Sequence, residues 1–200
     1  MDKNERLATH HRSGEIVDHW LGRHIAAAVG LEYIKQPRSI DGNGTVVDRA
    51  TGKTAYCHVK TTNSLPGHVL FEHTARGGES GWLFGRASVL TQVVQPSEVL
   101  SVRLGVARDY ILDRFGEPGD VEPLPPPQCK VSCEWVSRTT GYGDKFIFVP
   151  AVDLVRDCGA TRTSVPLLAE VVRLCKTARN NHLSDEWRRK ALTRLESLVR

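Results

Sequence analysis

A short β-hairpin in the first third of the chain is the feature that most constrains its fold. Gly44–Lys53 begins with β-branched residues and ends in a polar turn containing glycine, and Thr54–Thr62 follows as a second apolar run that carries His58 and Lys60. This pattern predicts two antiparallel strands. Because side chains alternate along a strand, His58 and Lys60 share one face, whereas Cys57 lies on the other.

The turn sets the register of this hairpin and thereby decides which polar side chains face each other. With the turn centred on residues 50–51, facing residues have numbers that sum to about 101, so His58 faces Asn43 and Lys60 faces Asp41. Facing side chains lie about 5 Å apart, which is close enough to share a metal ion or a water molecule. The hairpin therefore predicts a polar cluster on one face.

A carboxylate, a second ligand and a lysine on one strand face are components of a metal-dependent phosphodiesterase. The carboxylate would hold Mg²⁺ or Mn²⁺, which polarises the phosphate and lowers the pKa of a bound water. Lys60 would offset the charge that develops during attack, and Glu15, on a helix expected upstream, would complete the metal shell. Asp48 is the poorer ligand because it lies about 16 Å from Asn43 along an extended strand. The alternative interpretation is a solvated strand face with ordinary surface charges.

Hydrophobic periodicity and turn residues predict an alternation of helices and strands around the hairpin. Helices are expected at 7–30, 107–115, 164–178 and from 184 onward, and strands at 31–34, 44–48, 54–61, 69–72, 89–94, 99–102 and 146–149. The strand at 31–34 is expected to end at Gln36–Pro37, the strand at 69–72 to extend the hairpin, and the proline-rich run 117–128 to form a long loop. This order predicts an α/β domain at residues 1–158 with a basic helical extension at 159–200.

Positive charge is concentrated in the C-terminal extension. Residues 161–200 hold nine Lys or Arg and four Asp or Glu, whereas the other 160 residues hold 18 and 19. Such a basic surface predicts contacts with nucleic-acid phosphates, carried by Arg188, Arg189, Lys190 and Arg194; the alternative is a charged helix face that is merely solvated. An amphipathic stripe beginning at Trp187 would pack against the domain or form a homodimer through the C-terminal helices.

Composition excludes several other classes of protein. An apolar content of 40% and a charged content of 25% are those of a soluble globular chain. No apolar run approaches the roughly 20 residues that cross a bilayer, and the N-terminus lacks the apolar segment of a signal peptide. Five irregularly spaced cysteines suit a reducing compartment. We therefore expect a cytoplasmic location and no membrane partner.

The order of the elements adds a family resemblance. A helix carrying Glu15, then the hairpin, then His58-Val-Lys-Thr-Thr62 resembles the PD-(D/E)XK nuclease superfamily, which carries a helix Glu, an Asp on the second strand and (D/E)-x-K on the third. Downstream, Phe71–Glu72 followed by Gly81–Leu83 is similar to the family's strand and Gly-Trp loop. Phe146–Leu154 is similar to the closing segment of phage and bacterial members, including Holliday-junction-resolvase-like ones. The resemblance covers roughly residues 12–155.

This resemblance implies a restriction-endonuclease-like core, in which helices flank a mixed sheet, and a DNA endonuclease that hydrolyses phosphodiester bonds with Mg²⁺ or Mn²⁺. Glu15 matches the helix acid and Lys60 the motif lysine. His58 stands where the motif has an acid, and Asn43 stands near the second-strand Asp, with Asp41 two residues earlier on the same face.

These departures leave two alternatives. Histidine ligates Mn²⁺ or Zn²⁺ but is a poor ligand for Mg²⁺. One alternative is an atypical metal centre built from Glu15, Asp41, His58 and Glu72. The other is a catalytically degenerate nuclease-like module that binds nucleic acid or a protein partner.

Overall fold

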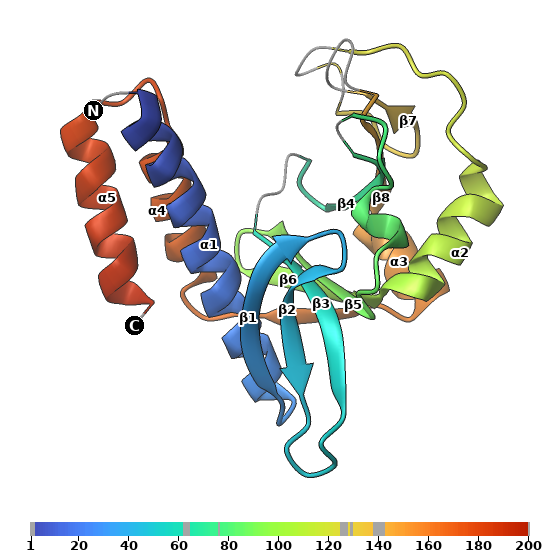
Figure 1. Cartoon of the computed structure of the whole chain (residues 1–200), viewed down its shortest axis with the longest axis horizontal. Helices are drawn as coiled ribbons and strands as arrows, with labels where there is room; N and C mark the ends of the chain where they lie inside the picture. Colours follow the sequence, from blue (N-terminus) through green and yellow to red (C-terminus); the bar gives the residue numbers. More distant parts are fainter. Residues whose placement is uncertain are drawn as a thin grey trace.

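The computed structural model describes residues 3–61, 65–75, 77–124, 128, 130–137 and 143–199. Within these residues the chain is an α/β protein with a mixed six-stranded sheet, a three-stranded sheet and five α-helices (Figure 1). In chain order the elements are α1 (Lys3–Ala28), β1 (Glu32–Ser39), β2 (Gly42–Val47), β3 (Thr54–Lys60), β4 (His68–Thr74), the 3₁₀ turn η1 (Trp82–Phe84), β5 (Val89–Gln95), β6 (Glu98–Arg103), α2 (Leu104–Phe115), β7 (Trp135–Val136), β8 (Lys145–Pro150), α3 (Ala151–Cys158), β9 (Thr161–Ser164), α4 (Leu168–Arg179) and α5 (Asp185–Leu198).

The large sheet has the strand order β1-β2-β3-β5-β6-β9. Its first three strands form an antiparallel meander, and β5 then lies parallel to β3. Gly44 pairs with Cys57 and Thr45 with Tyr56, so the predicted hairpin register is confirmed for these pairs. The ladder ends at Gly44 and Cys57, and the predicted pairs His58–Asn43 and Lys60–Asp41 are not part of it. Asn43 instead bonds to Asp18 of α1, whereas His58 packs against Trp82, so the predicted polar cluster on one face is wrong. A parallel neighbour requires a crossover, and the segment that makes it here contains β4 and η1.

Two details of the strand prediction are wrong. The strand expected to extend the hairpin is β4, which instead pairs with β8 in the small sheet. The place beside β3 goes to β5, whose five consecutive buried residues from Leu90 to Val94 suit a strand covered on both faces. Also, β1 continues through Gln36–Pro37 to Ser39. It is the edge strand of its sheet, where proline removes no required ladder hydrogen bond.

The two faces of the large sheet are covered by different layers. Helices α1 and α4 pack on one face around a cluster that includes Leu21, Cys57, Val59 and Leu168. Helices α2 and α3 and the small sheet form the layer on the right of Figure 1, with a separate core around Leu90 and other buried apolar residues. The sheet thus has one buried side for Cys57 and another for His58.

The C-terminal segment does not behave as an appendage. Strand β9 pairs with β6 in the large sheet, which explains why α4 starts at Leu168 rather than at Ser164 as predicted. Val165 and Leu168 lie in the same core cluster as Val59. No packing boundary therefore separates residues 159–199 from the rest. The predicted helix start at Ser184 is confirmed, since Ser184 Oγ accepts a hydrogen bond from the Trp187 N–H at 3.4 Å.

Other expectations are confirmed within the described ranges. The helix expected at 107–115 is α2, and residues 117–124 of the proline-rich run form neither a helix nor a named strand. Residues 125–127 of that run and Thr62 of the hairpin motif lie outside the described residues. Among the described helices, none combines the length and apolar character needed to cross a bilayer.

Candidate functional site

Asn43 is the second residue of β2, and its side-chain amide bonds to the backbone of the neighbouring strand β3. Its side chain is 6% exposed. Oδ1 accepts the Val59 N–H at 2.7 Å, and Nδ2 donates to the Val59 carbonyl at 2.8 Å. An amide can accept and donate at once, whereas a carboxylate can only accept. The local backbone therefore requires asparagine where the nuclease pattern has aspartate.

Asp18 of α1 is the carboxylate that reaches this point. It is 6% exposed. Its Oδ1 accepts the Thr61 N–H at 3.1 Å and the Thr61 hydroxyl at 2.7 Å, and its Oδ2 lies 3.4 Å from Asn43 Nδ2. We call Asp18, Asn43, Thr61 and the Val59 backbone the Asp18 network. It ties α1 to the ends of β2 and β3.

The sequence interpretation missed Asp18 and chose Glu15, one helical turn earlier. The sequence did contain a signal for Asp18, namely its position in the helix. Asp18 lies beside Val17 and Leu21 on the apolar stripe of α1, and both of these residues are fully buried. Glu15 is exposed and forms an ion pair with Lys35 of β1 at 3.1 Å. An acid within an apolar stripe is more informative than an acid at its rim.

A pocket of about 390 Å³ lies between α1, β1 and β2 and is the place where Glu15, Asp18 and Asn43 meet. Tyr33 lines it, donates to the Asn43 carbonyl at 3.0 Å and has its pKa raised by burial. His19 also lines it, and its pKa is lowered by burial and by the nearby cations Arg23 and Lys35. The pocket is polar, and Glu15, Asp18 and Asn43 all have hydrogen-bond partners within the chain.

His58 and Lys60 share a face, as predicted, but Trp82 from η1 occupies it. His58 is 1% exposed, and its ring centroid lies 5.3 Å from that of Trp82. Its Nε2 lies 3.0 Å from the Ile40 carbonyl, which can only accept, so Nε2 carries a proton. Lys60 Nζ lies 5.3 Å from the Trp82 ring centroid, within cation–π range. His58 is therefore a core histidine in this fold.

The other carboxylates predicted for the site serve different parts of the chain. Asp41 Oδ1 accepts the Arg86 N–H at 3.0 Å, which fastens the β1–β2 turn to the segment before β5. Asp48 closes the hairpin turn by accepting the Thr51 hydroxyl at 2.7 Å, and hydrogen bonds from Thr51 and Ala50 lower its pKa. Glu72 lies on β4 in the small sheet.

These placements do not fit a magnesium or manganese centre. Across the described ranges, no group of three or more His, Cys, Asp and Glu side chains is arranged to hold a metal ion. Glu15 faces Lys35, Asp41 faces the Arg86 backbone and His58 faces Ile40, so their donor atoms point to separate partners. We derive no metal-dependent step from them.

Comparison with known proteins gives no help here. Neither protein-family models, nor curated proteins, nor solved structures match this chain.

The basic residues predicted to contact nucleic acid divide into two groups. Arg188 is 1% exposed, donates from Nε to the Ala178 carbonyl at 3.2 Å and lies 3.5 Å from Asp185. It holds α5 against α4, so the expectation that it binds phosphate is wrong. Arg189, Lys190 and Arg194 are exposed. Lys190 pairs with Glu186 at 2.7 Å and Arg194 lies 3.9 Å from Glu170.

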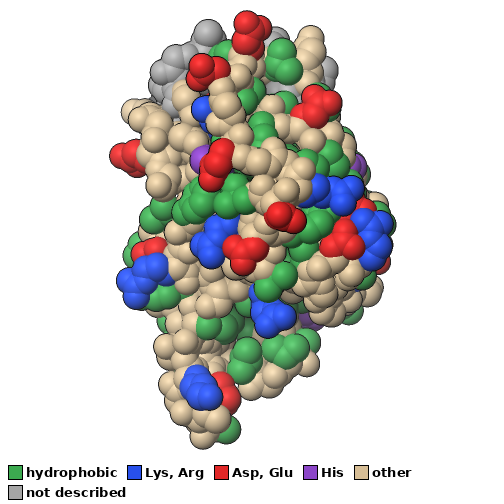
Figure 2. All heavy atoms as spheres, turned by 90° about the vertical axis from the view of Figure 1, so that its right-hand side faces the viewer, with side chains coloured by type: hydrophobic (Ala, Val, Ile, Leu, Met, Phe, Trp, Pro, Cys, Tyr) green, Lys and Arg blue, Asp and Glu red, His purple; other side chains and the backbone are tan. Residues whose placement is uncertain are grey.

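The opposite side of the molecule is not a basic surface. Figure 2 shows the face that carries α2, where acidic and basic side chains are interspersed rather than gathered by sign.

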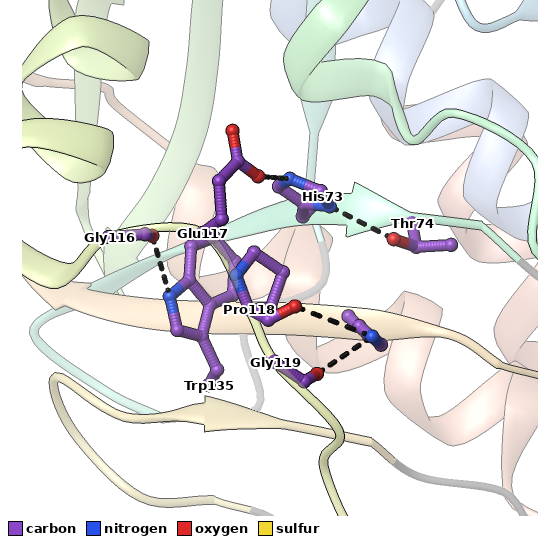
Figure 3. Close-up of polar contacts among 8 residues, drawn as sticks. His73, Thr74, Gly116, Glu117, Pro118, Gly119 and Trp135 are labelled. Carbon is purple, nitrogen blue, oxygen red and sulfur yellow. Dashed lines mark hydrogen bonds and ion pairs between the residues drawn. The ribbon is translucent and has the colours of Figure 1, made fainter.

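A second polar cluster links β4 to the segment after α2 (Figure 3). His73 bonds to Glu117 through Nε2 and to Thr74 Oγ1 through Nδ1, and its ring packs edge-on against Trp135. Trp135 Nε1 donates to the Gly116 carbonyl at 3.1 Å. The bonds to Glu117 and Gly116 fasten the segment after α2 to the small sheet, so we interpret the cluster as structural.

Proposed function

We propose that this chain is a nuclease-like module that binds nucleic acid without hydrolysing it. The observation that carries the proposal is the double hydrogen bond between Asn43 and Val59, at 2.7 and 2.8 Å. At the position of the second-strand acid, Asn43 thus joins β2 to the backbone of β3, and we call this pair of hydrogen bonds the backbone lock. His58 supports the same conclusion, because it is buried against Trp82 at the position of the motif acid.

The arrangement of elements supports a restriction-endonuclease-like core. Helix α1 covers a β1–β2–β3 meander, and β5 lies parallel to β3. The order of Asp18 on the helix, Asn43 on the second strand and Lys60 on the third follows the nuclease pattern with amide and imidazole replacements.

Charge supports nucleic acid as the partner. The C-terminal fifth of the sequence holds the whole positive excess. Arg173, Lys176 and Arg189 are exposed there, and within the described ranges none of them has an acidic partner. Exposed cations of this kind bind phosphates by releasing counterions from the nucleic acid.

The test combines binding and cleavage on the purified chain. Single-stranded and duplex DNA should bind at low salt, with log affinity falling linearly against log salt concentration. Neither DNA should be cut with Mg²⁺ or Mn²⁺. Cleavage that disappears in Glu15→Ala and Lys60→Ala would restore the metal-dependent nuclease, and an absence of DNA affinity at low salt would reject both nucleic-acid functions.

A further inference from the structure

A groove of about 420 Å³ runs along α4 at the ends of the parallel strands β3 and β5. One wall is a single face of α4, since the lining positions 169, 172, 173, 176, 177 and 180 recur at helical spacing. The other wall contains the end of β5 and the turn at Pro96. We call this the α4 groove. Its volume lies within the roughly 300–1,000 Å³ typical of small-molecule sites.

Two uncompensated cations lie one helical turn apart along this groove. Arg173 and Lys176 both line it and both are exposed. In the part of the chain that the structure describes, neither has an ion pair, and no Asp or Glu lines the groove. Lys190 and Arg194, in contrast, have carboxylates within 4.0 Å. The α4 groove thus favours an anion, and the arginine fork suits phosphate oxygens.

The floor of the groove is apolar. Val93 and Val94 are buried residues of β5, and Pro66 and Pro96 add apolar rings at the lining. Gln95 and Asn180 supply amides that can donate and accept. A phosphate alone would leave this apolar surface unused, whereas a nucleotide places a phosphate, a flat base and hydrogen-bonding edges in one ligand.

The groove also adjoins the nuclease-like site. Thr61 lines the α4 groove, and its hydroxyl and N–H bond to Asp18, which lines the pocket on the other side. A strand lying in the groove would therefore pass close to the Asp18 network and its pocket. That continuity favours a unit of a strand over an isolated metabolite.

We propose that the α4 groove binds one unpaired nucleotide of a nucleic-acid strand, with its phosphate on Arg173 and Lys176 and its base against the apolar lining at Pro66, Pro96 and Val172. The inference rests on the proposed nucleic-acid-binding function and specifies its ligand. A paired base is held in the stack of its duplex and must be unpaired and unstacked to enter the groove, so single strands or frayed ends are preferred over blunt duplex. Apolar contact with the base does not discriminate among bases.

The experiment measures fluorescence anisotropy of a labelled dT12 strand and of a blunt hairpin duplex with the full chain. The groove variant is Arg173→Gln/Lys176→Gln, and the matched control is Lys53→Gln/Arg103→Gln, which removes the same charge from exposed positions away from α4 and α5. We expect the groove variant to lose at least about 10-fold in dT12 affinity and about 1.4 in salt slope. The control should lose less than about 3-fold.

A second variant fills the groove without changing charge. Ala169 is exposed at its lining, so Ala169→Trp should retain the fold and duplex affinity while weakening dT12 binding by a similar factor. Competition with dTMP and with inorganic phosphate identifies the source of the ligand. We expect dTMP to displace dT12 weakly and inorganic phosphate to require far higher concentrations.

The outcomes separate this inference from the proposed function. If the groove variant and the control variant lose the same dT12 affinity, as their equal change in net charge alone would give, and Ala169→Trp has no effect, the groove assignment is overturned while nucleic-acid binding stands. If dTMP binds as tightly as dT12, the occupant is a free nucleotide and the strand assignment fails. If neither DNA binds at low salt, the proposed function falls together with the inference.

Discussion

The Asp18 network and the α4 groove meet at Thr61, yet they treat polar groups in opposite ways. In the network, Asp18, Asn43 and Thr61 are buried and bonded to one another or to the Val59 backbone. In the groove, Arg173 and Lys176 are exposed and, among the described residues, without an acidic partner. Satisfied buried polar groups hold a fold together, whereas uncompensated charges beside an apolar surface are available to a ligand.

The contrast teaches that a motif position and a functional position need not coincide. Asn43 and His58 stand where the proposed nuclease pattern has acids, and both make structural contacts, with Val59 and Trp82 respectively. Arg173 and Lys176 belong to no motif and have the chemistry of a binding site. Each prediction below tests whether the network is structural and the groove side functional.

The largest effect is expected from restoring the motif acid. His58→Glu would bury a carboxylate beside Trp82 and set it against the Ile40 carbonyl, which also only accepts. We expect a loss of about 4 kcal/mol in the free energy of unfolding, measured by urea denaturation, because a buried carboxylate set against a carbonyl that only accepts is costly.

The matched control is His58→Gln, which retains a donor for Ile40 and should lose about half as much or less. A His58→Glu protein that is as stable as wild type and cuts DNA with Mg²⁺ would show that the face shared by His58 and Lys60 is a dormant metal site rather than a core.

Breaking the backbone lock should have the next largest effect. Asn43→Asp removes the donor to the Val59 carbonyl and places a second carboxylate beside Asp18. We expect a loss of about 3 kcal/mol in the free energy of unfolding. The same substitution at the exposed Asn181 should change it by less than about 0.5 kcal/mol. Equal values for the two variants would mean that the lock is not structural.

Arg188 and Arg189 are neighbours in one basic run of α5, but Arg188 is buried and Arg189 is exposed. Arg188→Ala should cost about 2–3 kcal/mol of unfolding free energy, because its buried side chain packs at the α4–α5 interface and bonds to Ala178. Arg189→Ala, at an exposed position, should cost less than about 0.5 kcal/mol. Thermal or urea unfolding of both variants checks the ranking, which would be reversed if Arg188 were a surface phosphate ligand.

The smallest expected effect is a pH dependence from His19 at the rim of the network pocket. Burial together with Arg23 and Lys35 lowers the pKa of His19 from its usual 6.5. The folded state therefore binds this proton less tightly than the unfolded state, and the stability contributed by His19 is complete above pH 6.5 and lost as the pH falls below it. Urea titrations at pH 7.5 and 5.0 should show a smaller decrease for His19→Gln than for wild type. Identical decreases in the two proteins would show that His19 does not contribute to the pH dependence of stability.

Local patterns in the sequence determined a large part of this fold. Alternation and turn chemistry sufficed for the β2–β3 hairpin, its register and the shared face of His58 and Lys60, because these depend on residues close in the chain. The serine cap of α5 was likewise readable from its own sequence.

Only the tertiary structure decided which polar groups meet. The rotation of α1 against the sheet brings Asp18 rather than Glu15 to Thr61, and Trp82, from a distant turn, covers the face that His58 and Lys60 share. The packing of α5 on α4 buried Arg188 within a run that otherwise faces solvent. These outcomes depend on contacts between residues far apart in the chain, which periodicity does not encode.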